Sequence, residues 1–213
     1  MKTIALDENT RLHNKRVEVF MTAFLQSHSQ LYFYEKELIT AAHIHDIGKT
    51  KIPVEILNAP RKLTAEERET IDWHAYYSYE LAKAQGYSDT VCKLVLYHHG
   101  ENKPKKENID VSEEIKRHAA LLRVIDAYDA LTSKRAYHNK FSDEKAMDIL
   151  ISSQEFDSKA VELLAAWSER KEVLESFTGK VWNRHLTMLS SLVKVPSALN
   201  NINGNGRSLA PLV

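Results

Sequence analysis

The sequence predicts an all-α fold with one main domain. Only six glycines and five prolines punctuate the 213 residues. The long segments between them carry apolar residues three and four positions apart, which is the period of an α-helix. With 43% hydrophobic residues, a chain of this length can bury one core. We expect residues 1–194 to form that domain, and residues 195–213, which are rich in Asn and Gly, to be a disordered tail.

Eight helical segments follow from this periodicity. The third has the clearest start, a capping box in which Thr64 and Glu67 bond each other's free backbone amides. The segments are Thr10–Gln26, Tyr34–His45, Thr64–Gln85, Ser88–His98, Ser112–Ser133, Ser142–Ser152, Ser158–Glu169 and Lys171–Val193. Between them, Gly48–Pro60 and Gly100–Val111 are predicted to be loops.

Charge and composition limit the classes of partner that the protein can bind and the cellular compartment in which it is expected. The 29 basic and 29 acidic side chains cancel, so no basic field would attract nucleic acid or an anionic membrane. Cys92 is the only cysteine, which excludes an intramolecular disulfide and fits a reducing compartment. No stretch is long and apolar enough for a signal peptide or a membrane span. We therefore expect a cytoplasmic protein that binds neither nucleic acid nor membrane.

Histidine and aspartate occur in patterns that suit metal binding. His45-Asp46 ends an apolar helical stretch and offers an imidazole nitrogen beside a carboxylate oxygen, a pair suited to Fe, Mn or Zn. A single His-Asp pair is more often structural. His98-His99 stand just before Gly100. Because adjacent helical residues point about 100° apart, both imidazoles could reach one metal only near a helix end such as Gly100 would give.

Three more positions complete the candidate ligand set. Asp126 lies on a strongly apolar helix, where a cation or hydrogen bonds must offset the cost of burying its charge. With His13 and His74, the set spans five predicted helices, as in bundles that build two-metal sites from inward-facing side chains. Seven ligands are too many for one ion, so we expect two ions sharing one carboxylate, that of Asp46.

These motifs form an ordered series that resembles the HD-GYP family, the cyclic-di-GMP phosphodiesterase branch of the HD superfamily. The resemblance runs from about His13 to Trp167, and its specificity comes from the series as a whole. The matching stretches are His13-x-x-Arg16-Val17, His45-Asp46-Ile47-Gly48-Lys49, Ile52-Pro53, Ile56-Leu57, Leu63-Thr64, His74, His98-His99, Asp126-x-Tyr128-Asp129-Ala130-Leu131-Thr132-Ser133, Arg135, Tyr137 and Phe156-Asp157.

The resemblance implies an HD-superfamily helical bundle of about seven to eight helices around a di-metal site. Fe or Mn are the expected ions, with Zn, Mg and Ni as alternatives. Carried over position by position, the metal ligands of the family fall on His13, His45, Asp46, His74, His98, His99 and Asp126, the same set that the chemistry nominates.

The resemblance also implies an activity. It points to a phosphodiesterase in which a hydroxide activated by two metals attacks phosphorus, with cyclic di-GMP or a related signalling nucleotide as substrate. Asp46 and Lys49 are the expected catalytic residues. Lys49, Arg135 and His138 are the expected contacts to the substrate.

The sequence departs from the family mainly where the cyclic dinucleotide is recognised. The replacements are Lys105-Lys106-Glu107 for the Gly-Tyr-Pro signature, Gly100 for a Glu, Ser78 for a Gly, and Asn9 for a Glu that some members use to bind a third metal. We therefore expect two metals rather than three. The lysines of the altered loop, Lys103, Lys105 and Lys106, either form a replacement phosphate-binding surface or are a solvated turn.

Other conspicuous residues have simpler interpretations. His43 points to a different helix face from His45 and is expected to be a packed or hydrogen-bonded histidine. Asp129 and Thr132 lie one turn beyond Asp126 and are expected to support the ligands or cap the helix. Trp73 and the tyrosines are expected to pack in the core, without the alternation of a base-stacking platform.

Two rival functions stay open beside the phosphodiesterase. One keeps the metals but acts on mononucleotides or another signalling nucleotide. The other is a metal-bound, inactive module that binds a nucleotide or a protein. The sequence also leaves open a homodimer or a signalling-protein partner.

Overall fold

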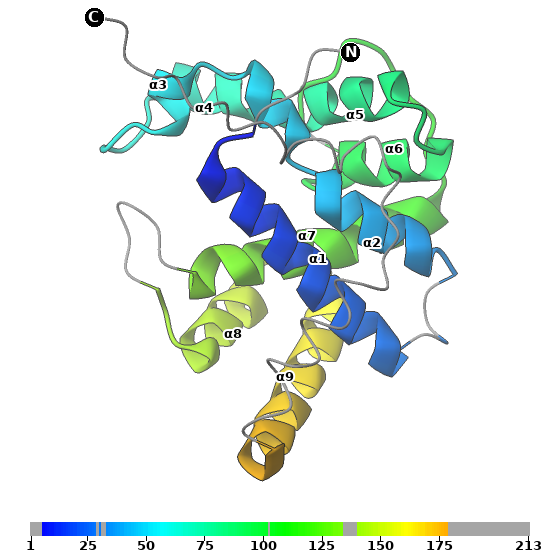
Figure 1. Cartoon of the computed structure of the whole chain (residues 1–213), viewed down its shortest axis with the longest axis vertical. Coiled ribbons are helices and arrows are strands. Elements are labelled where there is room, and N and C mark those ends of the chain that lie inside the picture. Colours follow the sequence, from blue (N-terminus) through cyan, green and yellow to red (C-terminus); the bar gives the residue numbers. More distant parts are fainter. Residues whose placement is uncertain (1–5, 29, 31–32, 102, 134–139, 179–213) are drawn as a thin grey trace, which may run out of the picture.

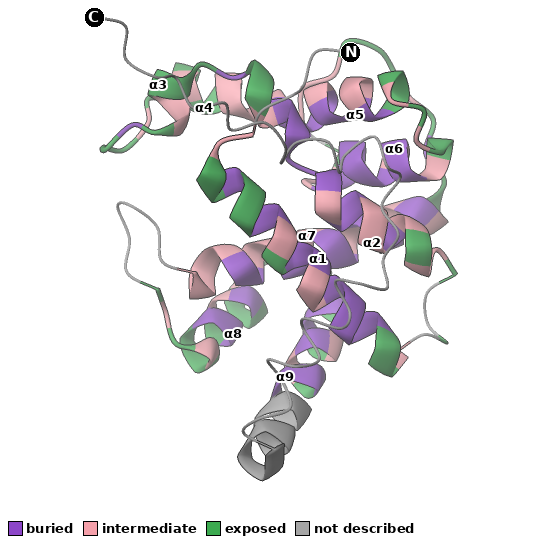
Figure 2. Ribbon diagram, in the orientation of Figure 1, coloured by how far each residue is buried: buried purple, intermediate pink, exposed green. Residues whose placement is uncertain are grey.

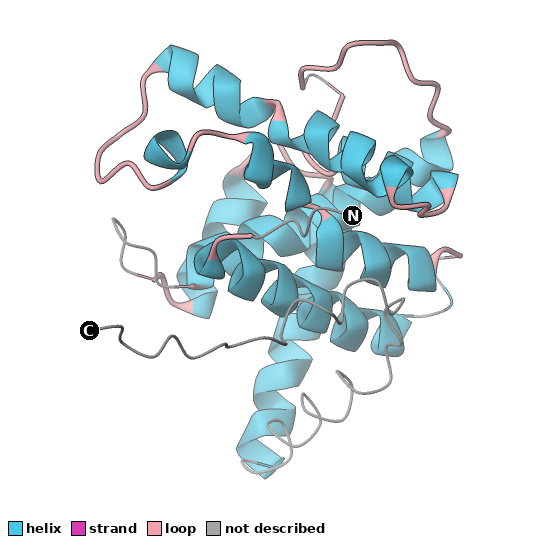
Figure 3. Cartoon of the chain, turned by 45° about the horizontal axis from the view of Figure 1, so that its top comes forward, coloured by secondary structure: helices cyan, strands magenta, loops and turns pink. Residues whose placement is uncertain are grey.

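The structure is a computed structural model and describes residues 6–28, 30, 33–101, 103–133 and 140–178 (Figure 1). Within these ranges the regular structure is entirely helical, as predicted, and Figure 3 shows no strand in them. None of the described helices is both long and apolar enough to cross a membrane. The helices are α1 (Glu8–His28), α2 (Glu35–Ile44), the 3-10 helix η2 (Ile47–Lys51), α3 (Val54–Leu57), α4 (Ala65–Asp72), α5 (His74–Ala84), α6 (Asp89–Tyr97), α7 (Glu113–Thr132), α8 (Asp143–Ser152) and α9 (Ser158–Thr178).

Four helices begin at the hydroxyl residues that the sequence offers for this purpose. The capping box of Thr64 and Glu67 is confirmed at the start of α4. Ser88, Ser112 and Ser142 start α6, α7 and α8, and each side chain accepts a hydrogen bond from the backbone amide three residues later. Such caps satisfy amides that the first helical turn leaves free, so local sequence fixes where these helices begin.

The core lies where α1, α2, α5, α6 and α7 meet. Helix α1 packs against α2 and α7, and α6 packs against α2, α5 and α7. Figure 2 shows that the sides of these helices that face one another are buried. Phe24, Leu38, Leu94 and Leu121 are fully buried at these contacts. Helices α8 and α9 pack on α7, below the core in Figure 1. The core helices thus fix the ends of α2 and α6 relative to α1 and α7.

Three element boundaries differ from the prediction. The expected helix Thr64–Gln85 is two helices, α4 and α5, joined at Trp73. At the break, His74 Nδ1 lies 2.6 Å from the Ile71 carbonyl, so the imidazole bonds a group near the end of α4. The predicted loop Gly48–Pro60 contains η2 and α3. Helix α9 runs unbroken from Ser158 to Thr178, across the expected break at 170. The expected tail lies outside the described residues.

Candidate metal centre

The structure brings all seven candidate ligands together. Helix α1 contributes His13, the end of α2 contributes His45 and Asp46, and the start of α5 contributes His74. The end of α6 contributes His98 and His99, and α7 contributes Asp126. Within each of three overlapping groups, the candidate ligand atoms all lie within 4.8 Å of one another. The groups are His74, His98 and His99; His13, His45 and Asp46; and His45, His98 and Asp126.

Asp46 lies at the centre of this cluster, and its two oxygens face different histidines. Oδ1 is 3.2 Å from His74 Nε2. Oδ2 is 3.7 Å from His13 Nε2 and 3.6 Å from His45 Nε2. The Asp46 side chain is only 2% exposed. One carboxylate therefore reaches two neighbouring groups of ligands, as a bridging ligand must.

Backbone carbonyls set the orientation of three imidazoles. The Nδ1 atoms of His45, His74 and His98 lie 2.9, 2.6 and 2.5 Å from the carbonyl oxygens of the residues three positions earlier. A carbonyl oxygen only accepts hydrogen bonds, so each Nδ1 carries a hydrogen, and in the neutral form of each ring Nε2 is the nitrogen with the lone pair. This is the tautomer in which Nε2 can bind a metal.

Two of these Nε2 atoms have no hydrogen-bond partner among the described residues. His45 Nε2 and His98 Nε2 are both buried, and both point into the cluster of nitrogen and oxygen donors. A buried imidazole nitrogen without a partner is costly. Divalent transition metals bind imidazole and carboxylate ligands of this kind, so the residues present fit a di-metal site.

The charges inside the cluster favour the ionised carboxylates. Burial alone would raise the pKa of Asp46, but the charge of Lys49 and of the neighbouring imidazoles outweighs burial and holds this pKa well below its ordinary value. Burial opposes ionisation of Asp126 as well, yet the hydrogen bond from His13 and the nearby imidazole of His45 hold its pKa well below the ordinary value. Both carboxyls are therefore in the form that binds cations.

Three histidines of the cluster have shifted pKa values, two lowered and one raised. Burial, followed by the neighbouring imidazoles, lowers the pKa of His98, and the same causes lower that of His99 to about 3. These two rings are neutral and ready to bind a metal. Burial would also lower the pKa of His13, but hydrogen bonds to Asp126 and Asp129 outweigh it and raise this pKa to about 9. Without metal, the His13 imidazole is therefore protonated at neutral pH, and its positive charge lies beside Asp46 and Asp126.

Asp129 supports His13 from outside the cluster. Its side chain is 1% exposed and accepts hydrogen bonds from His13 Nδ1 at 2.7 Å and from Arg16 Nε at 2.7 Å. Arg16 Nη2 adds a second bond at 2.9 Å, and Ser133 Oγ donates a further bond at 3.1 Å. Asp129 is thus a supporting residue, as the sequence suggested. The roles of Arg16 and Ser133 were missed, although Arg16 lies one helical turn after His13.

Helix η2 holds Lys49 over the centre. Lys49 Nζ lies 2.5 Å from Asp46 Oδ2, and its side chain is 23% exposed. The adjacent Gly48 allows this position because η2 packs directly on α5 there. A Cβ on Gly48 would come within 2.1 Å of the His74 carbonyl oxygen, and the Gly48 amide donates to Ser78 Oγ at 2.7 Å.

The other residues singled out from the sequence do not join the cluster in the described part of the chain. Arg135 and His138 lie outside the described residues. His43 bonds Glu18 at 2.8 Å rather than joining the cluster, as expected of a hydrogen-bonded histidine. Thr132 donates to the Tyr128 carbonyl at 2.8 Å, which is a local helix contact.

The lysines of loop 100–111 each contact a group of this chain, and the choice between a phosphate-binding surface and a solvated turn stays a prediction. Lys103 Nζ is 2.8 Å from Asp72 Oδ1. Lys105 Nζ donates to the Glu101 carbonyl at 3.1 Å and lies over the Tyr97 ring. Lys106 Nζ lies 3.8 Å from Glu80 Oε1 and over the ring of Tyr76. These contacts hold the loop against α4, α5 and α6.

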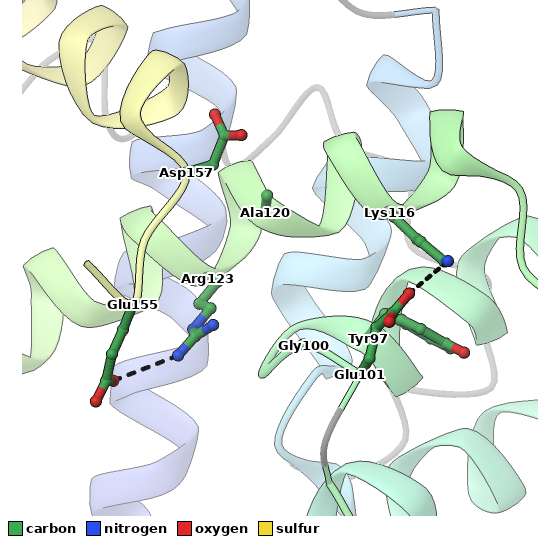
Figure 4. Close-up of a pocket in the computed structure, with 8 residues that line it drawn as sticks. All are labelled: Tyr97, Gly100, Glu101, Lys116, Ala120, Arg123, Glu155 and Asp157. Carbon is green, nitrogen blue, oxygen red and sulfur yellow. Dashed lines mark hydrogen bonds and ion pairs between the residues drawn. The ribbon is translucent and has the colours of Figure 1, made fainter. Parts of the chain in front are cut away.

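A small surface pocket lies at the end of α6, where Tyr97, Gly100 and Glu101 line it (Figure 4). Ala120 lines it, and four of its five charged side chains form ion pairs, Lys116 with Glu101 and Arg123 with Glu155. None of the seven candidate ligands lines this pocket. The candidate chemistry therefore lies in the histidine-aspartate cluster and not in the pocket.

Known proteins resemble this chain over most of its described part. A family model described as HD domain matches residues 5–160. The 3′3′-cGAMP-specific phosphodiesterase 2 of Vibrio cholerae is 28% identical over 177 residues, which cover 78% of this chain and 33% of the relative. A cyclic di-GMP phosphodiesterase of the same organism is 31% identical over 175 residues, 76% of this chain and 35% of the relative. This chain thus spans about a third of the length of these relatives.

A solved structure confirms the fold. The HD domain of the L. monocytogenes phosphodiesterase PgpH, in complex with cyclic-di-AMP, matches with a TM-score of 0.53 and 18% sequence identity, over 80% of this chain and 90% of that one. The resemblance predicted from the sequence motifs is confirmed by the family match and by these relatives. The chain belongs to the HD domain family.

Proposed function

We propose that the chain is a metal-dependent phosphodiesterase that hydrolyses a cyclic dinucleotide. One observation carries the proposal: the six other candidate ligands surround the carboxylate of Asp46, and the buried Nε2 atoms of His45 and His98 have no hydrogen-bond partner among the described residues. The names of the curated relatives, which specify cyclic di-GMP and 3′3′-cGAMP, support the substrate class.

Two groups of residues would hold the metals. The Oδ1 side of Asp46 lies beside the group of His74, His98 and His99, and its Oδ2 side lies beside His13 and His45. The second carboxylate, Asp126, completes the latter group, with its Oδ1 2.9 Å from His13 Nε2. Two divalent cations held there would neutralise charge on the phosphoryl oxygens and lower the pKa of water.

The protein's own cation has a separate role. Lys49 sits at the edge of the cluster, bonded to Asp46 and partly exposed, so its ammonium group can also meet a phosphate oxygen. Asp46 and Lys49 are therefore the proposed catalytic residues. Arg135 and His138 stay proposed substrate contacts, on the sequence resemblance alone.

The metal and the location are also proposals. Mixed imidazole and carboxylate donors favour Fe or Mn, although Zn, Mg and Ni accept parts of such a set. The single cysteine, Cys92, is free and buried, which fits a cytoplasmic protein. The balance of charge supports a nucleotide rather than a nucleic acid as the partner. A homodimer or a signalling-protein partner is also proposed, and sedimentation of the full chain with and without that protein would test it.

Anaerobic purification, metal analysis and a substrate panel test the function. The protein is loaded with Mn or Fe and given cyclic di-GMP, 3′3′-cGAMP, cyclic di-AMP and mononucleotides. We expect about two metals per chain and turnover of at least one cyclic dinucleotide. Asp46→Ala should abolish turnover, whereas Glu155→Gln, at the surface pocket, should not.

Other outcomes separate the rival functions. Turnover of mononucleotides alone would indicate a different nucleotide phosphohydrolase. Two metals with tight nucleotide binding and no turnover would indicate an inactive binding module. Less than one metal per chain, or full activity of Asp46→Ala, would overturn the proposed metal mechanism.

A further inference from the structure

The geometry points to a nucleobase-binding platform formed by Trp73 and Tyr77 beside the metal centre. This inference rests on the proposed function and extends it, because it assigns the part of the substrate that carries the base. The ligand class is a nucleotide whose phosphate lies at the metal centre and whose flat base stacks on these rings.

The two rings form a stacked pair at the start of α5. Trp73 and Tyr77 are one helical turn apart, their ring centroids are 6.0 Å apart, and their planes differ by 26°. Both residues are half-buried and pack against the core with part of their surface, whereas the neighbouring Tyr76 and Tyr79 are buried within it. The Tyr76 ring packs nearly perpendicular to the Trp73 ring, with their centroids 5.9 Å apart, and braces it. A braced and partly accessible aromatic pair is what base stacking needs.

The platform shares a helical turn with the metal centre. His74 directly follows Trp73, and its Nε2 lies 3.2 Å from Asp46 Oδ1. Adjacent residues on a helix point about 100° apart, so the Trp73 ring lies beside the centre rather than inside it. A nucleotide has the same arrangement, since the sugar places the base to one side of the phosphate.

One lysine lies over the Tyr77 ring, and another bonds the residue before Trp73. Lys51 Nζ lies 5.1 Å from the centre of the Tyr77 ring and 3.3 Å from Glu80 Oε2. Lys103, from the loop after the adjacent histidines, bonds Asp72, the residue before Trp73. Lys51 and Lys103 have side chains that are 40% and 32% exposed. Each is paired with an exposed or partly exposed carboxylate, a contact worth little in water that a phosphate can replace.

Together these features define one class of ligand. Cationic groups beside a stacked aromatic pair favour an anion that carries an aromatic ring system. Among phosphate esters, that description fits a nucleotide. The stacked rings and the lysines near them offer a way to recognise the substrate in a chain where Lys105-Lys106-Glu107 replace the family's signature loop.

Binding can be tested without turnover. Metal-loaded protein is titrated with a hydrolysis-resistant phosphorothioate analogue of cyclic di-GMP, and affinity is followed by calorimetry and by tryptophan fluorescence. We expect Trp73→Leu and Tyr77→Leu to weaken binding roughly 5- to 150-fold, the range that one base–aromatic stack supplies. Metal content should stay at the wild-type value.

Two control variants separate stacking from a loss of folding. Trp73→Phe keeps a ring, so it should bind within a few-fold of wild type but lose the fluorescence quench that the analogue causes. Tyr34→Leu makes the same change at another half-buried tyrosine, beside His118, and should leave affinity unchanged. Trp73→Leu should raise KM for cyclic di-GMP more than it lowers kcat, which a purely structural defect would not do.

The outcomes distinguish this inference from the proposed function. Wild-type affinity in both Trp73→Leu and Tyr77→Leu would overturn the platform, and so would the absence of analogue binding by the wild type. Binding that depends on the two rings, without turnover of any substrate, would leave the platform standing and overturn only the proposed hydrolysis.

Discussion

Asp129 Oδ2 lies 2.7 Å from His13 Nδ1, on the opposite side of the imidazole from Asp126. The bond fixes the rotation of the ring and directs Nε2 into the metal centre. Since Asp129 also accepts two bonds from Arg16, the supporting carboxylate is itself held in place. Partners of this kind raise the basicity of a metal-binding imidazole.

We therefore expect Asp129→Asn to lower metal affinity about 10- to 100-fold, the usual effect of losing such a partner. Calorimetric titration of the metal-free protein with Mn measures it. The matched control is Glu18→Gln, because Glu18 is also a buried carboxylate bonded to a histidine, His43, outside the cluster. Equal losses of metal affinity in the two variants would contradict a specific role for Asp129.

The position of Asp46 predicts how metals are lost. Its two oxygens face different groups of histidines, so Asp46→Ala should bind neither metal with wild-type affinity. His99→Ala removes a ligand from one group only and should keep about one metal per chain. Metal analysis after gel filtration gives the two stoichiometries. One metal retained in Asp46→Ala would show that this carboxylate does not bridge.

Much of this centre is predictable because its signals are local. Adjacent ligands at a helix end, as in His45-Asp46, can be read directly from the sequence. The capping box of Thr64 and Glu67 is equally local, since its partners are three residues apart. The all-α fold follows from a period that every core helix repeats.

What could not be predicted depends on contacts between distant parts of the chain. Asp129 and Arg16 are 113 residues apart, and no spacing rule connects them. The break at Trp73 was missed because the helical period runs through it, while the His74 side chain, which bonds the Ile71 carbonyl, occupies the junction. The stacked face of Trp73 likewise appears only once the ends of α4 and α5 are placed.

The pKa of His13 predicts how the metal-free protein responds to pH. This pKa is about 9 in the folded chain against an ordinary value of 6.5. The unfolded chain loses the proton first, so the stabilisation is fully present below pH 6.5 and is lost as pH rises through 9. In EDTA, urea denaturation should show the free energy of unfolding falling by up to about 3 kcal/mol between those values.

Two comparisons identify His13 as the source of this dependence. His13→Gln should show a flat free energy of unfolding over the same range. The lowered pKa values of His98 and His99 act only below pH 6.5 and so leave this window unchanged. Saturating Mn should reverse the slope, because the metal displaces the proton and binds more tightly as pH rises. An unchanged slope in His13→Gln would assign it to another group.

The contact of Gly48 with α5 predicts an unusually damaging substitution to alanine. The new Cβ would lie 2.1 Å from the His74 carbonyl oxygen and 2.4 Å from the Ser78 amide nitrogen, so the backbone of η2 or α5 must move. We expect Gly48→Ala to lower the free energy of unfolding by about 3 kcal/mol and to weaken metal binding, since both elements carry site residues.

Gly86→Ala is the control, because Gly86 has a φ of 81° but no atom within 4 Å of the added Cβ. It should cost only about 1–2 kcal/mol of backbone strain and leave metal affinity unchanged. Urea denaturation and Mn titration of both variants decide the matter, and a Gly48→Ala protein as stable as wild type would refute the close packing of η2 on α5.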